Sequence, residues 1–377
     1  MVFLALVLIS ISSSASAWSG DTHRLLAKES LKDVAEPWGL NQPVERTSFD
    51  RFLKKFSQRH PAIQTREEFC GWLQINPDSP FDRPSPAEQD RQTLTPLEIL
   101  TLYSARADDG RDMHLPYDQG EQFWFGSGTK SGSQAFRHME KPPFNPLHPL
   151  NTLGFPLGRI GQASRRAQIY FDLALAAYQL GEPYWAWNFL GAGLHYIQDL
   201  GQPYHTAQLL APLAIKGVQA YFQWGRKENV GWIQTVTRVV SNTHHYFEGY
   251  TDYLLWQENS SGRQWEKALS GRETFGDFGA MEDLAKQVRG HANQSALATV
   301  QATFQITGKN LLTAKIYDAG EVEGRPDDPL PYLTADQAQR MRGAGQISRI
   351  VVGVFAHVGK AQRTYVARFL KEKTEEP

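Results

Sequence analysis

The chain has 377 residues, of which 41% are hydrophobic and 12% aromatic, and its 39 basic and 40 acidic residues nearly cancel. This balance gives no indication of a polyanionic partner, so no stable nucleic-acid partner is expected. The single cysteine, Cys70, excludes an intramolecular disulfide and is expected to be a buried core thiol.

The first 17 residues have features of a signal peptide. An apolar run from Phe3 to Ile11 is followed by small residues and by an Ala-x-Ala pattern that ends at Ala17. The run is too short to span a bilayer, which favours a signal peptide over a membrane anchor. It lacks the positive charges that usually precede such a run in a signal peptide. A buried N-terminal helix is the alternative. We predict cleavage after Ala17, a mature chain that begins at Trp18, and a secreted or periplasmic protein.

The remaining sequence has helical rather than strand periodicity. A first helix is predicted from about Thr22, and a second over 97–107 behind a capping Thr95. Further helices are predicted over 160–180, from Pro183 to the residues before Gly201, and over 231–256, 281–297 and 347–370. The segments 109–156 and 259–275 are rich in Gly, Ser or Pro and are predicted to be loops. We therefore predict an all-α protein with long loops.

Two pairs of a histidine and an acid are placed to bind metal. His195 and Asp199 lie four residues apart on a predicted helix, as do His244 and Glu248, so each pair shares one helix face. His205 follows the helix break after the first pair and can return toward the same cavity. Imidazole and carboxylate ligands at this spacing suit zinc. Taken alone, either pair is more often a solvated pair on a helix surface.

Three further positions offer ligands. Cleavage after Ala17 would free the α-amino group of Trp18 five residues before His23, and both groups bind metal when deprotonated. An acid at Asp108, with Asp109 as a rival, and His138 complete the candidates. The other histidines have no acid at ligand spacing and are expected to be structural: His60, His114, His148, His291 and His357.

This ordered set resembles the zinc-dependent phospholipase C family and, more distantly, the related S1/P1 nucleases. The similarity is carried by the N-terminal Trp18, the start of a helix at Thr22-His23, the motif His195-x3-Asp199-x5-His205, and His244-x3-Glu248. It covers about 18–256 and the C-terminal helix. It implies a single multi-helix domain over 18–377 with insertions at about 110–156, 206–230 and 259–331.

The resemblance also implies three clustered zinc ions. The ligands would be Trp18, His23 and Asp199 for the first, Asp108, His138, His195 and a bridging Asp199 for the second, and His205, His244 and Glu248 for the third. Adjacent dications activate water and bind phosphate oxygens, which is what hydrolysis of a phosphodiester requires. Asp108 would orient or deprotonate the attacking water.

Three functions compete at this point. A phospholipase C, which releases diacylglycerol and a phosphorylated head group, is favoured because the last ligand is Glu248, where the nucleases usually have Asp. A single-strand nuclease or 3'-nucleotidase is the alternative, and a non-catalytic zinc-stabilised binding protein is the third. The expected substrate is a phospholipid or another phosphodiester, with transient contact at a membrane surface. Choline-selective members have an aromatic residue after the acid at Asp108, whereas this chain has Asp109, so the head group stays open.

Overall fold

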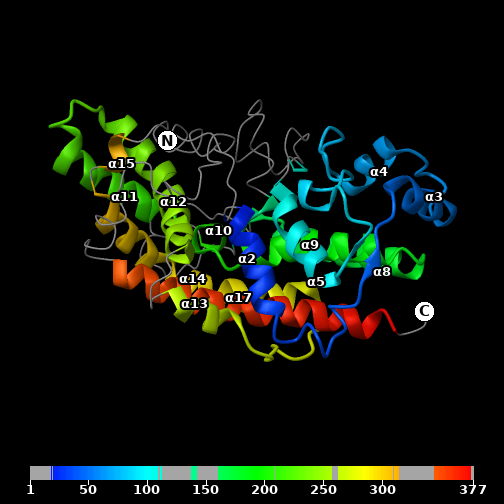
Figure 1. Cartoon of the computed structure of the whole chain (residues 1–377). Coiled ribbons are helices and arrows are strands. Elements are labelled where there is room, and N and C mark those ends of the chain that lie inside the picture. The colour runs from blue at the N-terminus through cyan, green and yellow to red at the C-terminus, as the bar shows by residue number, and fades with distance from the viewer. Residues whose placement is uncertain are drawn as a thin grey trace.

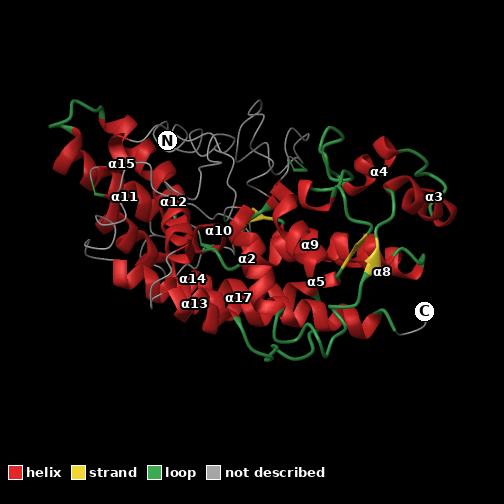
Figure 2. Ribbon diagram, in the orientation of Figure 1, coloured by secondary structure: helices red, strands yellow, loops and turns green. Residues whose placement is uncertain are grey.

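The computed structural model describes residues 18, 20–108, 111–112, 137–141, 160–207, 209–256, 262–308, 310–313 and 344–374. This part of the chain is mostly helical, which confirms the predicted all-α class (Figures 1 and 2). Within it, the strands form two short antiparallel pairs: β1 (Val44–Glu45) with β2 (Thr93–Leu94), and β3 (Glu140–Lys141) with β4 (Ile160–Gly161). The predicted signal peptide, Asp109 and most of the 110–156 insertion lie outside the described residues.

One helix, α9 (Pro183–Asp199), forms the centre of the molecule. Every residue of α9 after Pro183 is buried, as expected for a helix that is apolar on all sides. It packs against α8 (Ala163–Gln179), α5 (Pro96–Ala105), α2 (Gly20–Leu31) and α17 (Ala344–Glu372). A Cβ at Gly193 would collide with the hydroxyl of Tyr365, so glycine lets α17 approach α9 closely. The C-terminal residues of α9 are thereby placed among four other helices.

Two helices begin at the residues that the sequence predicted as their starts. Thr95 caps α5, because its hydroxyl accepts a hydrogen bond from the Glu98 amide while the Glu98 carboxylate accepts one from the Thr95 amide. Pro183 opens α9 as predicted. Three other helices also lie where they were predicted: α12 (Trp232–Trp256), α14 (Met281–Thr307), which continues beyond 297, and α17.

The 259–275 segment was predicted to be a loop but contains a helix, so that prediction was wrong there, and the 206–230 segment, for which no helix was predicted, is helical as well. The 206–230 segment contains α11 (Leu210–Ala220) and a π-helical turn, η4 (Tyr221–Gly225). The 259–275 loop contains α13 (Gly262–Leu269), and α15 (Asn310–Thr313) lies in the same insertion. Trp265 and Leu269 of α13, four residues apart, are buried. Their packing outweighs the Gly- and Ser-rich composition on which the loop prediction depended.

Two helices that the sequence analysis did not predict, α3 (Phe49–Arg59) and α4 (Arg66–Leu73), pack through phenylalanines. Phe49, Phe52 and Phe56 each contact the ring of Phe69. Cys70 is buried beside them, as expected, and burial raises the pKa of its thiol to about 11. This cluster therefore explains the cysteine as part of the core.

The helices are arranged along a long axis that α17 follows (Figure 1). The pair α3 and α4 lies at one end, and α11, α12 and α15 lie at the other. The short helices α10 (Pro203–Thr206), η1 (Pro86–Glu88) and η2 (Arg106–Asp108) connect the longer ones. No helix in the described ranges has both the length and the apolar character needed to cross a membrane.

Candidate metal centre

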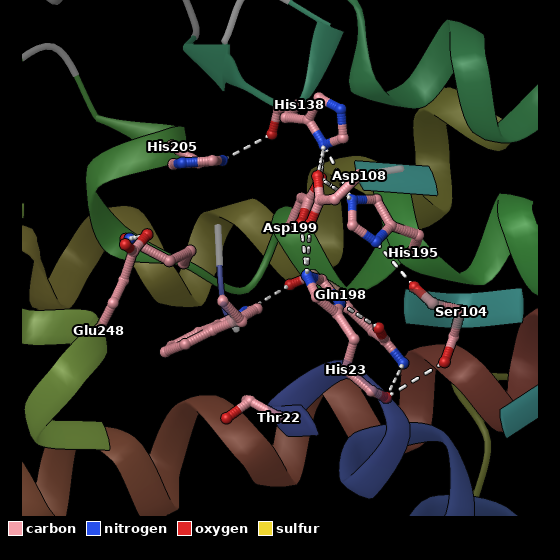
Figure 3. Close-up of polar contacts among 12 residues, drawn as sticks. Thr22, His23, Ser104, Asp108, His138, His195, Gln198, Asp199, His205 and Glu248 are labelled. Carbon is pink, nitrogen blue, oxygen red and sulfur yellow. Dashed lines mark hydrogen bonds and ion pairs between the residues drawn. The ribbon is translucent and has the colours of Figure 1, made fainter. Parts of the chain in front are cut away.

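Eight of the nine predicted ligand residues place ligand atoms in three adjoining groups (Figure 3). The atoms of each group lie within 4.8 Å of one another, and the groups are His23, His195 and Asp199; Asp108, His138 and His195; and His205, His244 and Glu248. They come from segments far apart in the sequence, namely α2, η2, the residues before β3, α9, α10 and α12. The structure therefore gathers candidate metal ligands into one cluster.

The central helix α9 supplies His195, which belongs to two of the groups, and Asp199, which also lies 2.8 Å from His138 of the second group. His195 Nδ1 donates a hydrogen bond to the Ser104 carbonyl, 2.7 Å away, so its Nε2 faces the cluster. That Nε2 lies 3.3 Å from Asp199 Oδ2 and 3.4 Å from Asp108 Oδ1. A backbone carbonyl thus fixes the ring nitrogen that is left to bind a metal.

His23 is oriented by Gln198, a residue that the sequence analysis did not identify. The Gln198 side-chain oxygen accepts the Nδ1 proton of His23 at 2.5 Å, and His23 Nε2 faces Asp199 Oδ1 at 3.6 Å. The Gln198 amide nitrogen donates to Gln362 at 2.8 Å, and this bond sets which way the amide points. The position of Gln198, next to Asp199 on α9, was the only sequence signal that pointed to it.

Trp18 lies beside this pair and is held there by its side chain. The side chain is fully buried, and its indole nitrogen donates to the Gln198 carbonyl at 3.3 Å. Its ring packs against Phe247 and Phe355. The indole therefore fixes Trp18 against α9, at the residue before Asp199.

His138 is held in the opposite orientation by Asp112, which the sequence analysis also missed. His138 Nδ1 lies 2.8 Å from Asp199 Oδ2, and its Nε2 lies 3.3 Å from Asp112 Oδ2. Asp112 is buried among Arg137, Arg166 and Tyr196, whose hydroxyl donates to it at 2.6 Å. Burial raises the pKa of Asp112, but Arg166 and His138 outweigh it and hold the pKa well below its usual range. An ionised carboxylate thus supports the outer nitrogen of His138.

This arrangement predicts the effect of replacing Asp112. At about pH 9, where a proton no longer competes with the metal for His138, the metal affinity of the His138 group should fall by about 10- to 100-fold in Asp112→Asn, because the carboxylate that orients the ring is lost. Tyr196→Phe is the matched control, since it removes one hydrogen bond to Asp112 and leaves the carboxylate in place. Competition with a chromophoric chelator measures both. Equal affinities for Asp112→Asn and the unmodified protein would contradict an orienting role.

The third group is linked to the second through the backbone. His205 Nδ1 donates to the His138 carbonyl at 2.7 Å, which leaves its Nε2 toward the cluster. His244 Nε2 lies 2.8 Å from Glu248 Oε1, one helical turn away on α12. The side-chain nitrogen of Gln202 donates a hydrogen bond to the Glu248 carboxylate at 3.3 Å. The side-chain oxygen of Gln202 accepts one from the backbone N–H of Tyr204 at the start of α10. Gln202 therefore supports both His205 and Glu248.

The residues present fit a bound metal on two grounds. Tetrahedral zinc with bonds of about 2.0–2.1 Å places neighbouring ligand atoms roughly 3.3 Å apart. In the cluster His195 Nε2 lies 3.3 Å from Asp199 and 3.4 Å from Asp108, and His23 Nε2 lies 3.6 Å from Asp199. In addition, several buried ligand atoms of the cluster have no hydrogen-bond partner within the described part, among them His23 Nε2, Asp199 Oδ1 and His205 Nε2. Such orphaned atoms are rare unless a ligand satisfies them.

The electrostatics of the cluster also favour a cation. Burial lowers the pKa of His23 to about 4 and of His205 to about 3, so both imidazoles are neutral near pH 7 and available as ligands. Burial raises the pKa of Asp199, but His195 and His138 outweigh it and keep the carboxylate ionised. Asp199 faces imidazole nitrogens on both oxygens. A buried anion in this setting is well matched to a dication.

One edge of the cluster is open to solvent. The side chains of Asp108, His244 and Glu248 are 17%, 15% and 12% exposed, whereas those of His195 and Asp199 are fully buried. A water or substrate oxygen can therefore reach the cluster between Asp108 and the third group.

The histidines expected to be structural lie elsewhere where they are described. His357 on α17 donates a hydrogen bond from Nδ1 to the Gly353 carbonyl at 3.1 Å, and its ring stacks on that of His291 of α14 with the ring centroids 3.8 Å apart. His60 stacks on Phe56 at 4.2 Å. His114 and His148 lie outside the described residues.

Comparison of the chain with protein-family models, curated proteins and solved structures finds no match.

Proposed function

We propose that the mature chain is a zinc-dependent phosphodiester hydrolase, most closely resembling phospholipase C, that is exported after cleavage behind Ala17. The observation that carries the proposal is the convergence of eight residues into three adjoining ligand groups; these residues were selected from the sequence by helical spacing and by the family resemblance. Metal clusters of this composition bind phosphate oxygens, activate water and neutralise the leaving oxygen. The final ligand Glu248 and the sequence Leu194-His195-Tyr196 favour a phospholipid over a nucleic acid as substrate.

The roles of the side chains follow from their exposure and contacts. Asp199 lies between the first two groups and would hold a metal in each, while His23, His138 and His195 complete those sites. Asp108 is the exposed acid at the edge of the cluster. It would accept the proton of the attacking water. Burial raises the pKa of Asp108, but the imidazoles of His195, His138 and His23 outweigh that effect and hold the pKa below its usual range, so the carboxylate is ionised near pH 7.

A panel of substrates assayed side by side tests this proposal. Protein that begins at Trp18 should contain two to three zinc ions by elemental analysis, as the resemblance implies. It should hydrolyse p-nitrophenylphosphorylcholine and release diacylglycerol from phospholipid vesicles. Chelation should reduce both rates by at least about 100-fold, since the water is activated by metal.

The same panel separates the alternatives. Clear preference for single-stranded DNA over every lipid would favour the nuclease reading, and release of phosphatidic acid would indicate cleavage of the wrong bond. Bound zinc without turnover of any substrate would favour a zinc-stabilised binding protein. Protein without tightly bound transition metal would contradict the whole proposal.

A further inference from the structure

The hairpin formed by α11, η4 and the start of α12 lies between the ligand His205 and the ligands His244 and Glu248, and it exposes several large apolar side chains. Within the described residues six large apolar side chains are exposed, and four of them fall between 215 and 232: Ile215, Val218, Phe222 and Trp232. This stretch begins soon after α10, which carries His205, and leads into α12, which carries His244 and Glu248. Single exposed apolar residues are ordinary, but a cluster of them marks an interaction site.

The helix α11 is apolar on two opposite sides. Leu213, Gly217 and Ala220 form the buried side, and a Cβ at Gly217 would lie 2.7 Å from the backbone of Val236, so this face packs tightly on α12. Ile215 and Val218 lie on the other side, 54% and 40% exposed, and Phe222 continues that face into η4 with 65% exposure. A surface helix normally presents polar residues opposite its buried face. The exposed face of α11 is therefore suited to a second apolar environment.

The charges at the tip of the hairpin indicate what that environment is. The 206–232 segment contains Lys216, Arg226 and Lys227 against one acid, Glu228, a net charge of +2. Arg226 and Lys227 are exposed where the hairpin turns. Apolar side chains bordered by basic residues match the acyl region and anionic head groups of a phospholipid surface. The same basic residues would repel one another if two copies of the chain docked through this face.

We propose that the outer face of α11 and η4, defined by Ile215, Val218 and Phe222 and bordered by Arg226 and Lys227, docks on the surface of a phospholipid bilayer that contains anionic lipid. The choice of a bilayer over a protein partner rests in part on the proposed phospholipase activity. His244 lies twelve positions after Trp232 on α12, a rise of about 18 Å along the helix. Docking at the tip therefore places the metal ligands of α12 within about 18 Å, along that helix, of its docked end.

Vesicle co-sedimentation of the full mature chain tests the proposal. The assay uses vesicles of phosphatidylcholine alone and of phosphatidylcholine with an equal amount of phosphatidylglycerol, with a chelator present so that lipid is not consumed. Ile215→Ser combined with Phe222→Ser should weaken binding to the mixed vesicles by about tenfold or more. Arg226→Gln combined with Lys227→Gln should weaken it by about thirtyfold and leave binding to phosphatidylcholine unchanged. Trp72→Ser, an exposed aromatic on α4 at the other end of the molecule, is the control.

The outcomes separate this proposal from the proposed function. All of these variants should hydrolyse p-nitrophenylphosphorylcholine at the unmodified rate, because none of the changed residues lies in the metal cluster. If vesicle binding is weakened by these double substitutions but the protein hydrolyses no substrate, the result would support the docking surface and contradict the proposed phospholipase activity. Hydrolysis with vesicle binding unaffected by the Ile215 and Phe222 changes would overturn the docking surface alone. Self-association that disappears in the same double variant, without vesicle binding, would also overturn it in favour of a second copy.

Discussion

Asp199→Asn is expected to be the most damaging single substitution in the cluster. The Asp199 carboxylate lies 3.6 Å from His23 Nε2 and 2.8 Å from His138 Nδ1, so it faces two ligand groups at once. An amide in its place keeps the shape but removes the negative charge that would neutralise neighbouring dications. We expect loss of at least one bound zinc and a fall in turnover of about a thousandfold or more, an effect of roughly 4 kcal/mol on the activation free energy.

Metal-dependent stability distinguishes a ligand from a residue that only supports packing. If the cluster binds zinc as proposed, zinc should raise the unfolding temperature of the unmodified chain, and Asp199→Asn should lose most of that increase. Asp172→Asn, at an exposed position on α8, should keep it. If the zinc-induced increase is the same in both variants, Asp199 does not bridge metal ions.

The sequence predicts the candidate centre better than it predicts the surrounding fold. His195 and Asp199 were recognised because helical spacing places them on one face, and the structure confirms that geometry. Asp112 and Gln198 could not be recognised in this way. Their function depends on contacts to His138 and His23, which are 26 and 175 residues away in the sequence, and spacing along one helix carries no information about such pairs.

The helices that were missed illustrate a second limit. The loop prediction for 259–275 relied on local composition, whereas α13 is held by Trp265 and Leu269, which pack against distant parts of the core. Local propensity is a weak indicator when tertiary packing supplies most of the stability of a helix. In contrast, α5 and α9 were predicted well because Thr95 and Pro183 mark their starts in the sequence itself.

The histidines of the cluster fall into two classes that respond to pH in opposite directions. Burial lowers the pKa of His138, but Asp112 and Asp199 outweigh it and raise the pKa to about 9 from an ordinary value of 6.5. In the metal-free protein this contribution to stability is fully present below pH 6.5 and is lost as the pH rises through about 9. The lowered pKa values of His23 and His205 contribute stability above pH 6.5 that is lost as the pH falls through about 4 and about 3.

Metal binding near neutral pH should therefore release a proton from the His138 side of the cluster. His138 Nδ1 lies 2.8 Å from His195 Nε2, so protons on both nitrogens would repel each other, and the pair holds one between them. Zinc must displace that proton, whereas His23 and His205 are already neutral. We expect release of about one proton at pH 7 and an affinity that rises about tenfold per pH unit until pH is near 9, where His138 deprotonates on its own.

Calorimetric titration of the metal-free protein with zinc, in buffers of different ionisation enthalpy, counts the protons released. His357→Ala is the control, because His357 lies on α17 and stacks on His291 rather than facing the cluster. It should release the same number of protons as the unmodified protein. Asp112→Asn should release fewer at pH 7, because removal of that carboxylate lowers the pKa of His138 toward its ordinary value. Zinc binding that releases no proton and has the same affinity from pH 6.5 to 8.5 would show that His138 is neutral before the metal arrives.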